Sequence, residues 1–129
     1  MFTLLLLATA TVALPSPISG DFDHDGKRDI AQFVASPKGT LSLVIRRGAT
    51  GKSMKVVDWF PRNSDVFLSR ASRGRFKTWC GKGGGSDNDP CPRENVNLRG
   101  GELMFGAREA SESVVLWTGT GFEVVLMSD

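Results

Sequence analysis

The chain has 129 residues, of which 40% are apolar and 23% are charged, and its 16 basic and 14 acidic side chains give a formal net charge of +2. A concentrated basic surface supplies most of a protein's affinity for nucleic acid, and a net charge of this size does not indicate one. We therefore expect no nucleic-acid partner. The length is enough for one domain with a modest core.

The first predicted element is an apolar run over residues 2–14, FTLLLLATATVAL. It is too short to span a bilayer as a helix, and its length and position are typical of the apolar region of a secretory signal. No Lys or Arg precedes it, and an N-terminal strand is the alternative. We expect residues 1–19 to be the signal segment, cleaved between residues 13 and 19, and residues 20–129 to be a secreted or periplasmic domain without a membrane span.

The most informative stretch follows at residues 20–31, GDFDHDGKRDIA. Four aspartates fall at positions 1, 3, 5 and 9 of a short loop, with a glycine at position 6 where the chain must turn sharply: Asp21, Asp23, Asp25, Asp29 and Gly26. Ca²⁺ takes about six to eight oxygen ligands, and alternating residues of a tight loop can point several carboxylates at one ion. The spacing therefore predicts a Ca²⁺ site, with a polar turn of solvated aspartates as the alternative. The loop is not an EF-hand, because position 12 is Gln32 instead of Glu.

The longer stretch GDFDHDGKRDIAQF resembles the Asp-rich loop of FG-GAP and VCBS-type repeats, which occur in integrin-like β-propellers and in secreted bacterial proteins. The resemblance implies that the loop opens a β-strand and binds Ca²⁺ through the four aspartates and the backbone carbonyl of Lys27. A full propeller is excluded, because the chain carries no second copy of the loop. More broadly, the order of this loop, a WCGKG…C segment, an EASESVVLW stretch and a final SD is similar to a group of small, uncharacterised secreted bacterial proteins.

Short alternating or apolar runs between turns rich in glycine predict strands along the rest of the chain. The predicted strands cover residues 30–35, 41–46, 55–60, 66–69, 75–80, 102–106, 113–118 and 122–126. Eight or nine short strands predict an all-β fold, a small antiparallel sandwich or barrel in a single domain. A helical turn within residues 109–115 is a minor alternative.

Two of these strands carry specific expectations about faces. In the strand over residues 75–80, alternation places Phe76 and Cys80 opposite Arg75, Lys77 and Trp79. The last strand should turn Phe122, Val124 and Leu126 inward, as one arm of a hairpin.

The chain has two cysteines, Cys80 and Cys91. An even number of cysteines in an exported protein favours a disulfide, here at the base of a glycine-rich surface loop over residues 81–92. Two cysteines alone cannot form a structural zinc site.

Several other motifs favour structural interpretations. Residues 48–53, GATGKS, lack the first glycine of a phosphate-binding loop and precede an expected strand. The glycines of residues 81–85 favour a flexible loop over an anion-binding nest. The basic and aromatic residues of 70–79 favour a solvated strand face over a nucleic-acid or glycan site. Residues 87–89, Asp-Asn-Asp, are a weak candidate for a second cation site.

Catalysis has little support in the sequence. His24 is the sole imidazole, tyrosine is absent, and the His24 side chain should point to solvent between two metal-facing aspartates. Glu109 and Glu112 are better explained as solvating side chains than as an acid–base pair. The sequence favours a monomeric, exported Ca²⁺-binding domain with a binding or structural role toward a protein or glycan partner. The alternative is a small secreted hydrolase or hydrolase inhibitor acting through a surface loop.

Overall fold

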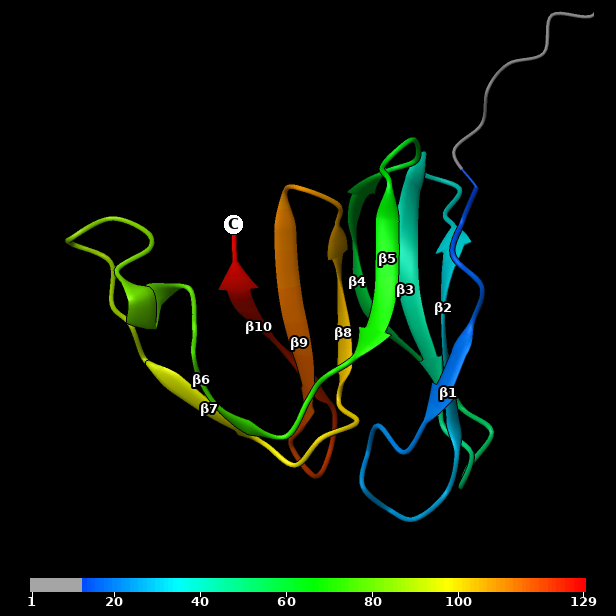
Figure 1. The fold of residues 1–129 in the computed structure, drawn as a ribbon. Helices are drawn as coiled ribbons and strands as arrows, with labels where there is room; N and C mark the ends of the chain where they lie inside the picture. Colours follow the sequence, from blue (N-terminus) through cyan, green and yellow to red (C-terminus); the bar gives the residue numbers. More distant parts are fainter. Residues whose placement is uncertain (1–12) are drawn as a thin grey trace, which may run out of the picture.

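The computed structural model describes residues 13–129, in which ten strands form three antiparallel sheets (Figure 1). The strands are β1 (Ile18–Gly20), β2 (Asp29–Ala35), β3 (Thr40–Arg46), β4 (Ser53–Pro61), β5 (Val66–Arg70), β6 (Gly74–Lys77), β7 (Asn95–Leu98), β8 (Leu103–Ala107), β9 (Ser111–Trp117) and β10 (Phe122–Ser128). One short 3₁₀ helix, η1 (Cys80–Lys82), is the only helical element in this range. Most of the predicted signal segment, residues 1–12, lies outside the described residues.

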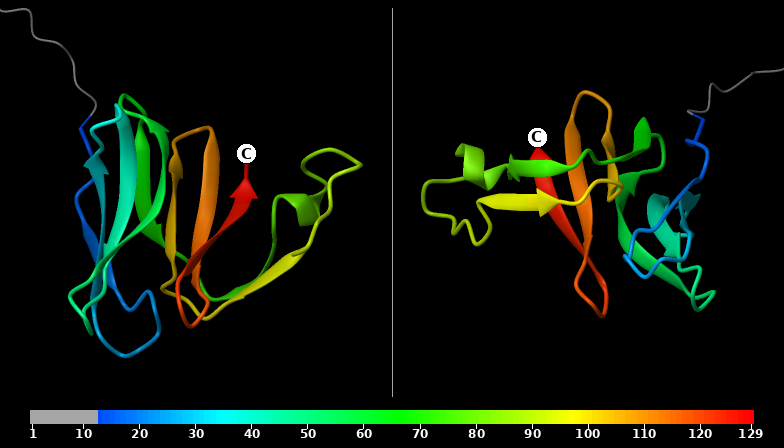
Figure 2. Two further views of the ribbon diagram at one scale, coloured as in Figure 1. Left: turned by 180° about the vertical axis from the view of Figure 1, so that it is seen from behind. Right: turned by 60° about the horizontal axis from the view of Figure 1, so that its bottom comes forward.

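Two four-stranded sheets form a small sandwich. Sheet A has the order β1-β2-β3-β4, and sheet B has the order β10-β9-β8-β5. The β6–β7 ribbon is an excursion between β5 and β8 and projects beyond sheet B (Figure 2). The predicted all-β sandwich is confirmed, and the barrel alternative is wrong because the sheets stay open and face each other.

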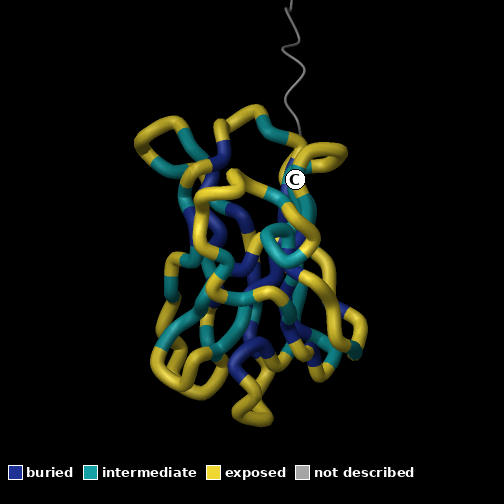
Figure 3. The backbone as a smooth tube through the Cα atoms, turned by 90° about the vertical axis from the view of Figure 1, so that its left-hand side faces the viewer, coloured by how far each residue is buried: buried dark blue, intermediate teal, exposed yellow. Residues whose placement is uncertain are grey.

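The main core lies between the two sheets, because alternate residues of each strand point inward. Its centre is an aromatic cluster in which Phe33 of β2 meets Phe60 of β4 at 5.9 Å between ring centroids and Phe105 of β8 at 6.5 Å, both edge to face. Such pairs contribute about 0.5–1.5 kcal/mol each beyond the area they bury. Buried segments accordingly fill the middle of the molecule, and exposed loops close both ends (Figure 3).

Sheet B is buried on both faces. Val114, Val125 and Met127 point away from the main core and pack with Val96 and Leu98 of the β6–β7 ribbon in a second apolar cluster. Burial on both faces explains why β9 and β10 contain continuous apolar runs, VVLW and VVLM, where a half-exposed strand would alternate.

The predicted inward face of β10 is confirmed for two of its three residues. Phe122 and Val124 pack against the main core. Leu126 is 36% exposed, so its prediction is wrong. β10 is the edge strand of sheet B, and Leu126 lies beyond the last residue of this strand that packs against the main core.

Other differences from the predicted strands arise around the ribbon. β6 ends at Lys77 and the chain turns into η1, so Phe76 and Cys80 do not share a strand face as predicted. β7 was missed because Asn95 and Asn97 alternate with its two apolar residues over only four positions. The helical alternative for residues 109–115 is wrong, since β9 already begins at Ser111.

Cys80 and Cys91 form the predicted disulfide, with their Cα atoms 5.6 Å apart. Within the glycine run after Cys80, packing requires Gly84, because a Cβ there would overlap the ring of Trp79. Within residues 13–129, no helix has the length and apolar character needed to cross a bilayer.

Candidate metal centre

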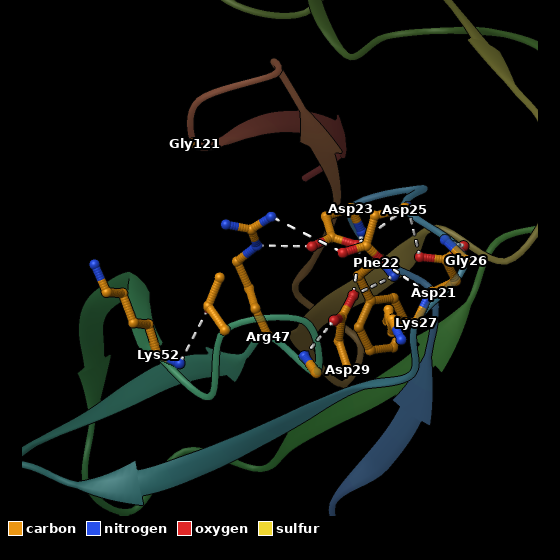
Figure 4. A network of polar contacts seen from close by, with 12 residues as sticks. Asp21, Phe22, Asp23, Asp25, Gly26, Lys27, Asp29, Arg47, Lys52 and Gly121 are labelled. Atoms are coloured by element: carbon orange, nitrogen blue, oxygen red, sulfur yellow. Dashed lines mark hydrogen bonds and ion pairs between the residues drawn. The ribbon is translucent and has the colours of Figure 1, made fainter.

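The Asp-rich loop joins β1 to β2 at one end of the sandwich (Figure 4). The pairing of Gly20 with Asp29 in the β1–β2 ladder fixes the two ends of the loop side by side. As a result, carboxylate oxygens of Asp21, Asp23 and Asp29 lie within 4.8 Å of one another. The fold thus brings together three of the four aspartates that the sequence predicts as metal ligands.

Asp29 organises the centre of the loop. Its side chain is fully buried, Oδ2 accepts hydrogen bonds from the backbone N–H groups of Phe22 at 2.8 Å and Asp23 at 3.2 Å, and Oδ1 accepts one from Gly48 at 2.9 Å. Phe22 is itself buried in the main core. The carboxylate therefore connects the loop to the core and to the β3–β4 turn.

Asp21 holds the outer turn of the loop. Its two oxygens accept hydrogen bonds from the backbone N–H groups of Asp25 at 3.0 Å and Gly26 at 2.9 Å. Gly26 has a φ of +82°, which agrees with the predicted need for glycine at this position. Asp25 lies outside the group of three, and one of its oxygens accepts the N–H of Lys27 at 2.8 Å.

Asp23 is paired with Arg47, a residue that the sequence analysis missed. Arg47 Nε donates to Asp23 Oδ2 at 2.7 Å, and the Asp23 side chain is completely buried. The guanidinium carbon also lies 4.5 Å from the ring centroid of Trp117, so Arg47 spans the gap from the loop to β9. Arg47 stands just beyond an expected strand, and no local pattern relates it to a loop more than twenty positions earlier.

The pKa values of the two buried carboxyl groups, those of Asp23 and Asp29, are shifted in opposite directions. Burial raises the pKa of Asp29 above its ordinary value; backbone hydrogen bonds oppose that shift, and the neighbouring Asp23 charge adds to it. Burial also opposes ionisation of Asp23, but the hydrogen bond from Arg47 together with hydrogen bonds from Asp25 and Asp29 outweighs burial and holds the pKa of Asp23 below its ordinary value. Among residues 13–129, Arg47 is the one cationic side chain within ion-pair distance of this group, so the centre has more acidic than basic charge.

The donor set determines which ions fit. A carboxylate oxygen that accepts one N–H retains a second acceptor position, so the hydrogen bonds within the loop do not exhaust the three carboxylates. Hard divalent cations prefer oxygen ligands, whereas zinc favours nitrogen and sulfur. The cluster can therefore hold a hard metal ion.

His24 connects the loop to sheet B. Its Nε2 lies 4.0 Å from Oε2 of Glu102, a buried carboxylate that accepts the backbone N–H groups of Arg99 and Gly100 at 2.8 and 2.9 Å. His24 is exposed, as predicted, and its side chain, which is 27% exposed, also approaches this carboxylate. Among residues 13–129, no hydrogen bond joins His24 to a serine hydroxyl.

The remaining motifs have local structural roles. Residues 48–52 lie in the β3–β4 turn and Ser53 begins β4, and a Cβ on Gly48 would overlap the carbonyl oxygen of Arg28. In the cystine loop, Asp89 Oδ2 accepts the N–H of Ser86 at 3.2 Å within the same turn. The structure thus gives Gly48 and Asp89 local roles in their turns.

No protein-family model matches the chain, and no curated protein or solved structure matches it either. The resemblance of residues 20–33 to FG-GAP and VCBS-type loops therefore stays a prediction. The observation that bears on function is the local geometry of the acidic loop.

Proposed function

We propose that this chain is an exported β domain that binds Ca²⁺ in the loop at residues 21–29. In this proposal the domain has a binding or structural role at the cell envelope or outside the cell, and it acts as a monomer. The observation that carries the proposal is the convergence of the Asp21, Asp23 and Asp29 carboxylates within 4.8 Å, with two of the three residues buried. Buried like charges repel strongly, and a divalent cation offsets that repulsion.

The proposed ligand set adds the Asp25 carboxylate and the Lys27 carbonyl to these three. Ca²⁺ accepts such a set because its coordination is flexible and takes about six to eight oxygens, including water. Mg²⁺ demands a compact octahedron and retains its own water, so it should compete weakly. Calcium is also the ion that the resemblance to FG-GAP and VCBS-type loops implies.

The Arg47 guanidinium should weaken the binding of Ca²⁺ to the loop. It already neutralises Asp23 at 2.7 Å, so an entering cation must compete with it. We therefore propose an affinity in the range of extracellular calcium modules, with a dissociation constant on the order of 10⁻⁴ to 10⁻³ M.

Export is supported by the disulfide, because such bonds persist in oxidising compartments outside the cytoplasm. The apolar run at residues 2–14 also supports export, because it has the length and position of the apolar region of a signal segment. Ile18 and Ser19 pair with β2, so cleavage before Ile18 would leave β1 intact. We propose that processing falls in the early part of the window between residues 13 and 19.

Isothermal titration calorimetry of the purified protein with Ca²⁺, repeated with Mg²⁺, tests the site. We expect binding heat for Ca²⁺ that Asp21→Asn and Asp29→Asn abolish. The matched control is Asp87→Asn, which makes the same change of charge in the exposed cystine loop and should bind normally. An absence of Ca²⁺ heat together with an unchanged melting temperature in EDTA would refute the proposal.

A further inference from the structure

A cavity of about 580 Å³ lies between the β6–β7 ribbon and the outer face of sheet B. Apolar side chains at the edge of the second cluster contribute to its lining, among them Leu98 of β7, Met104 of β8 and Met127 of β10. Pockets for small organic ligands have volumes of about 300–1,000 Å³ and are mostly apolar. The size and the apolar lining both suit one small organic molecule.

Cationic groups surround this apolar surface. Arg70, Lys77 and Lys82 line the cavity from β5, β6 and η1, and Glu112 is the one acidic side chain that lines it. Among residues 13–129, none of the three cations forms an ion pair with a carboxylate, and Arg70 donates only to the backbone carbonyl of Ser19. Both Nε and Nη2 of Arg70 donate to that carbonyl on β1, so Lys77 and Lys82 are the cationic groups of the lining that remain without a carboxylate or carbonyl partner in the described part of the chain.

Phe76 adds an exposed aromatic ring to the same cavity. It lies on β6 beside Lys77, and 40% of its surface is exposed, although its ribbon covers the second cluster. A ligand with an apolar body would remove this ring from water, and that removal is favourable in proportion to the apolar area covered. The flexible stems of Lys77 and Lys82 allow their ammonium groups to reach a head group while the stems cover the apolar body.

We propose that this cavity binds a small amphipathic organic anion, of the chemistry of a medium-chain carboxylate. The apolar chain contacts Leu98, Met104 and Met127, and the carboxylate lies between Lys77 and Lys82. The charge of the lining favours this occupant over a neutral or cationic amphipath of the same length. The cavity is separate from the acidic loop, so the proposal does not depend on calcium binding.

The test uses decanoate as the probe, below its micelle concentration, with the full chain in EDTA. EDTA prevents calcium from precipitating the carboxylate and separates this result from that of the calcium experiment. Binding is followed by chemical shifts of backbone amides, and decyltrimethylammonium at the same concentrations serves as the cationic counterpart. We expect saturable decanoate shifts concentrated at residues 69–72, 76–82, 98, 104 and 127–128, with binding at least tenfold tighter than that of the cation.

Two pairs of variants separate the site from general charge and general hydrophobicity. Lys77→Glu with Lys82→Glu should weaken decanoate binding at least tenfold, while Lys38→Glu with Lys52→Glu makes the same charge change on exposed turns and should alter it less than twofold. Ser69→Trp should fill the cavity and abolish binding, whereas Ser53→Trp, at an exposed serine of β4, should leave binding unchanged. The amide spectra show directly that each variant is folded.

Equal binding of decanoate and decyltrimethylammonium would overturn the proposal. It would also be overturned by decanoate shifts located elsewhere or by equal losses in both lysine pairs. An absence of saturable shifts up to about 1 mM decanoate would overturn it too, because a dissociation constant above that value is too weak for a functional small-ligand site.

Discussion

Arg47 and Asp23 form a partly buried ion pair, with Nε 2.7 Å from Oδ2, in the middle of an acidic loop. The same guanidinium lies 4.5 Å from the ring centroid of Trp117, so one side chain bridges the β1–β2 loop and sheet B. Arg47 therefore supplies an internal positive charge at the position where the proposed calcium ion would act. The two cations should compete for Asp23.

Replacement of Arg47 by a neutral residue tests whether it competes with Ca²⁺ for Asp23. In Arg47→Gln we expect Ca²⁺ to bind more tightly, by about tenfold, which is within the usual range of coupling between two ligands. Without the metal the variant should melt at a lower temperature than wild type, because Asp23 loses its partner while buried. Arg46→Gln removes the same charge from the exposed end of β3 and should change neither property. Weaker Ca²⁺ binding in Arg47→Gln would show that Arg47 supports the metal site and does not compete with it.

The pH dependence of stability reports on the same pair. The pKa of Asp23 lies below its ordinary value of 3.8 in the folded protein, because its hydrogen bonds together outweigh the effect of burial, and the bond from Arg47 is the largest of them. A group of this kind contributes stability above its unfolded pKa and loses that contribution as the pH falls through its folded pKa. We expect the free energy of unfolding to fall more steeply below about pH 4 in wild type than in Arg47→Gln.

Denaturant unfolding without metal, at several pH values from about 2.5 to 6, provides the measurement. Asp29, whose pKa is raised by burial, changes stability in the opposite direction, and it is present in both proteins. The difference between the two profiles therefore isolates the pair. Parallel profiles would contradict the assigned cause of the Asp23 shift.

Asp29→Asn should destabilise the domain even without metal. The carboxylate accepts three backbone N–H groups, and an amide replaces one acceptor oxygen with a second donor. At least one buried N–H then loses its partner, at a cost of about 1–3 kcal/mol. Urea unfolding in EDTA measures the loss, with Asp87→Asn as the exposed control. A loss below about 0.5 kcal/mol, the usual range for surface changes, would mean that Asp29 does not organise the loop.

Gly48→Ala tests the close approach of two turns. An added Cβ would overlap the carbonyl oxygen of Arg28, and backbone on both sides limits relaxation. We expect a loss of about 1–3 kcal/mol, as for other overpacked sites. Gly121→Ala is the matched control, because the space around that glycine is open and its backbone is not left-handed. Equal stabilities for the two variants would contradict the packing described for the β3–β4 turn.

The disulfide and the acidic loop should stabilise the domain independently. The cystine loop and the loop at residues 21–28 lie at different ends of the molecule (Figure 1). Replacement of Cys80 and Cys91 by serine should cost roughly 2–3 kcal/mol by freeing the unfolded chain. In combination with Asp29→Asn, the losses should add within about 0.5 kcal/mol. Coupling well above about 1 kcal/mol in this double-mutant cycle would show that the two regions communicate.

The sequence was sufficient for features set by local patterns. Alternation and turn residues predicted most strands of both main sheets, and the spacing of the aspartates with Gly26 located the acidic loop. Features that depend on contacts between distant residues were missed. Arg47 reaches the loop through the pairing of β3 with β2, and Trp117 and Glu102 approach it through the packing of sheet B against sheet A. The covering of the outer face of sheet B by β7 follows from the path of the ribbon.

The central claim is that Ca²⁺ binds the folded loop, and stability as a function of free Ca²⁺ tests it most directly. A ligand that binds only the folded state stabilises it by RT ln(1 + [L]/Kd), so above Kd the free energy of unfolding should rise by about 1.4 kcal/mol per tenfold increase in free Ca²⁺. We predict this rise for wild type and Asp87→Asn, and little change for wild type in Mg²⁺ or for Asp21→Asn and Asp29→Asn in Ca²⁺. A wild-type free energy of unfolding that is independent of Ca²⁺, or one that rises equally in the Asp21→Asn and Asp29→Asn variants, would contradict the account.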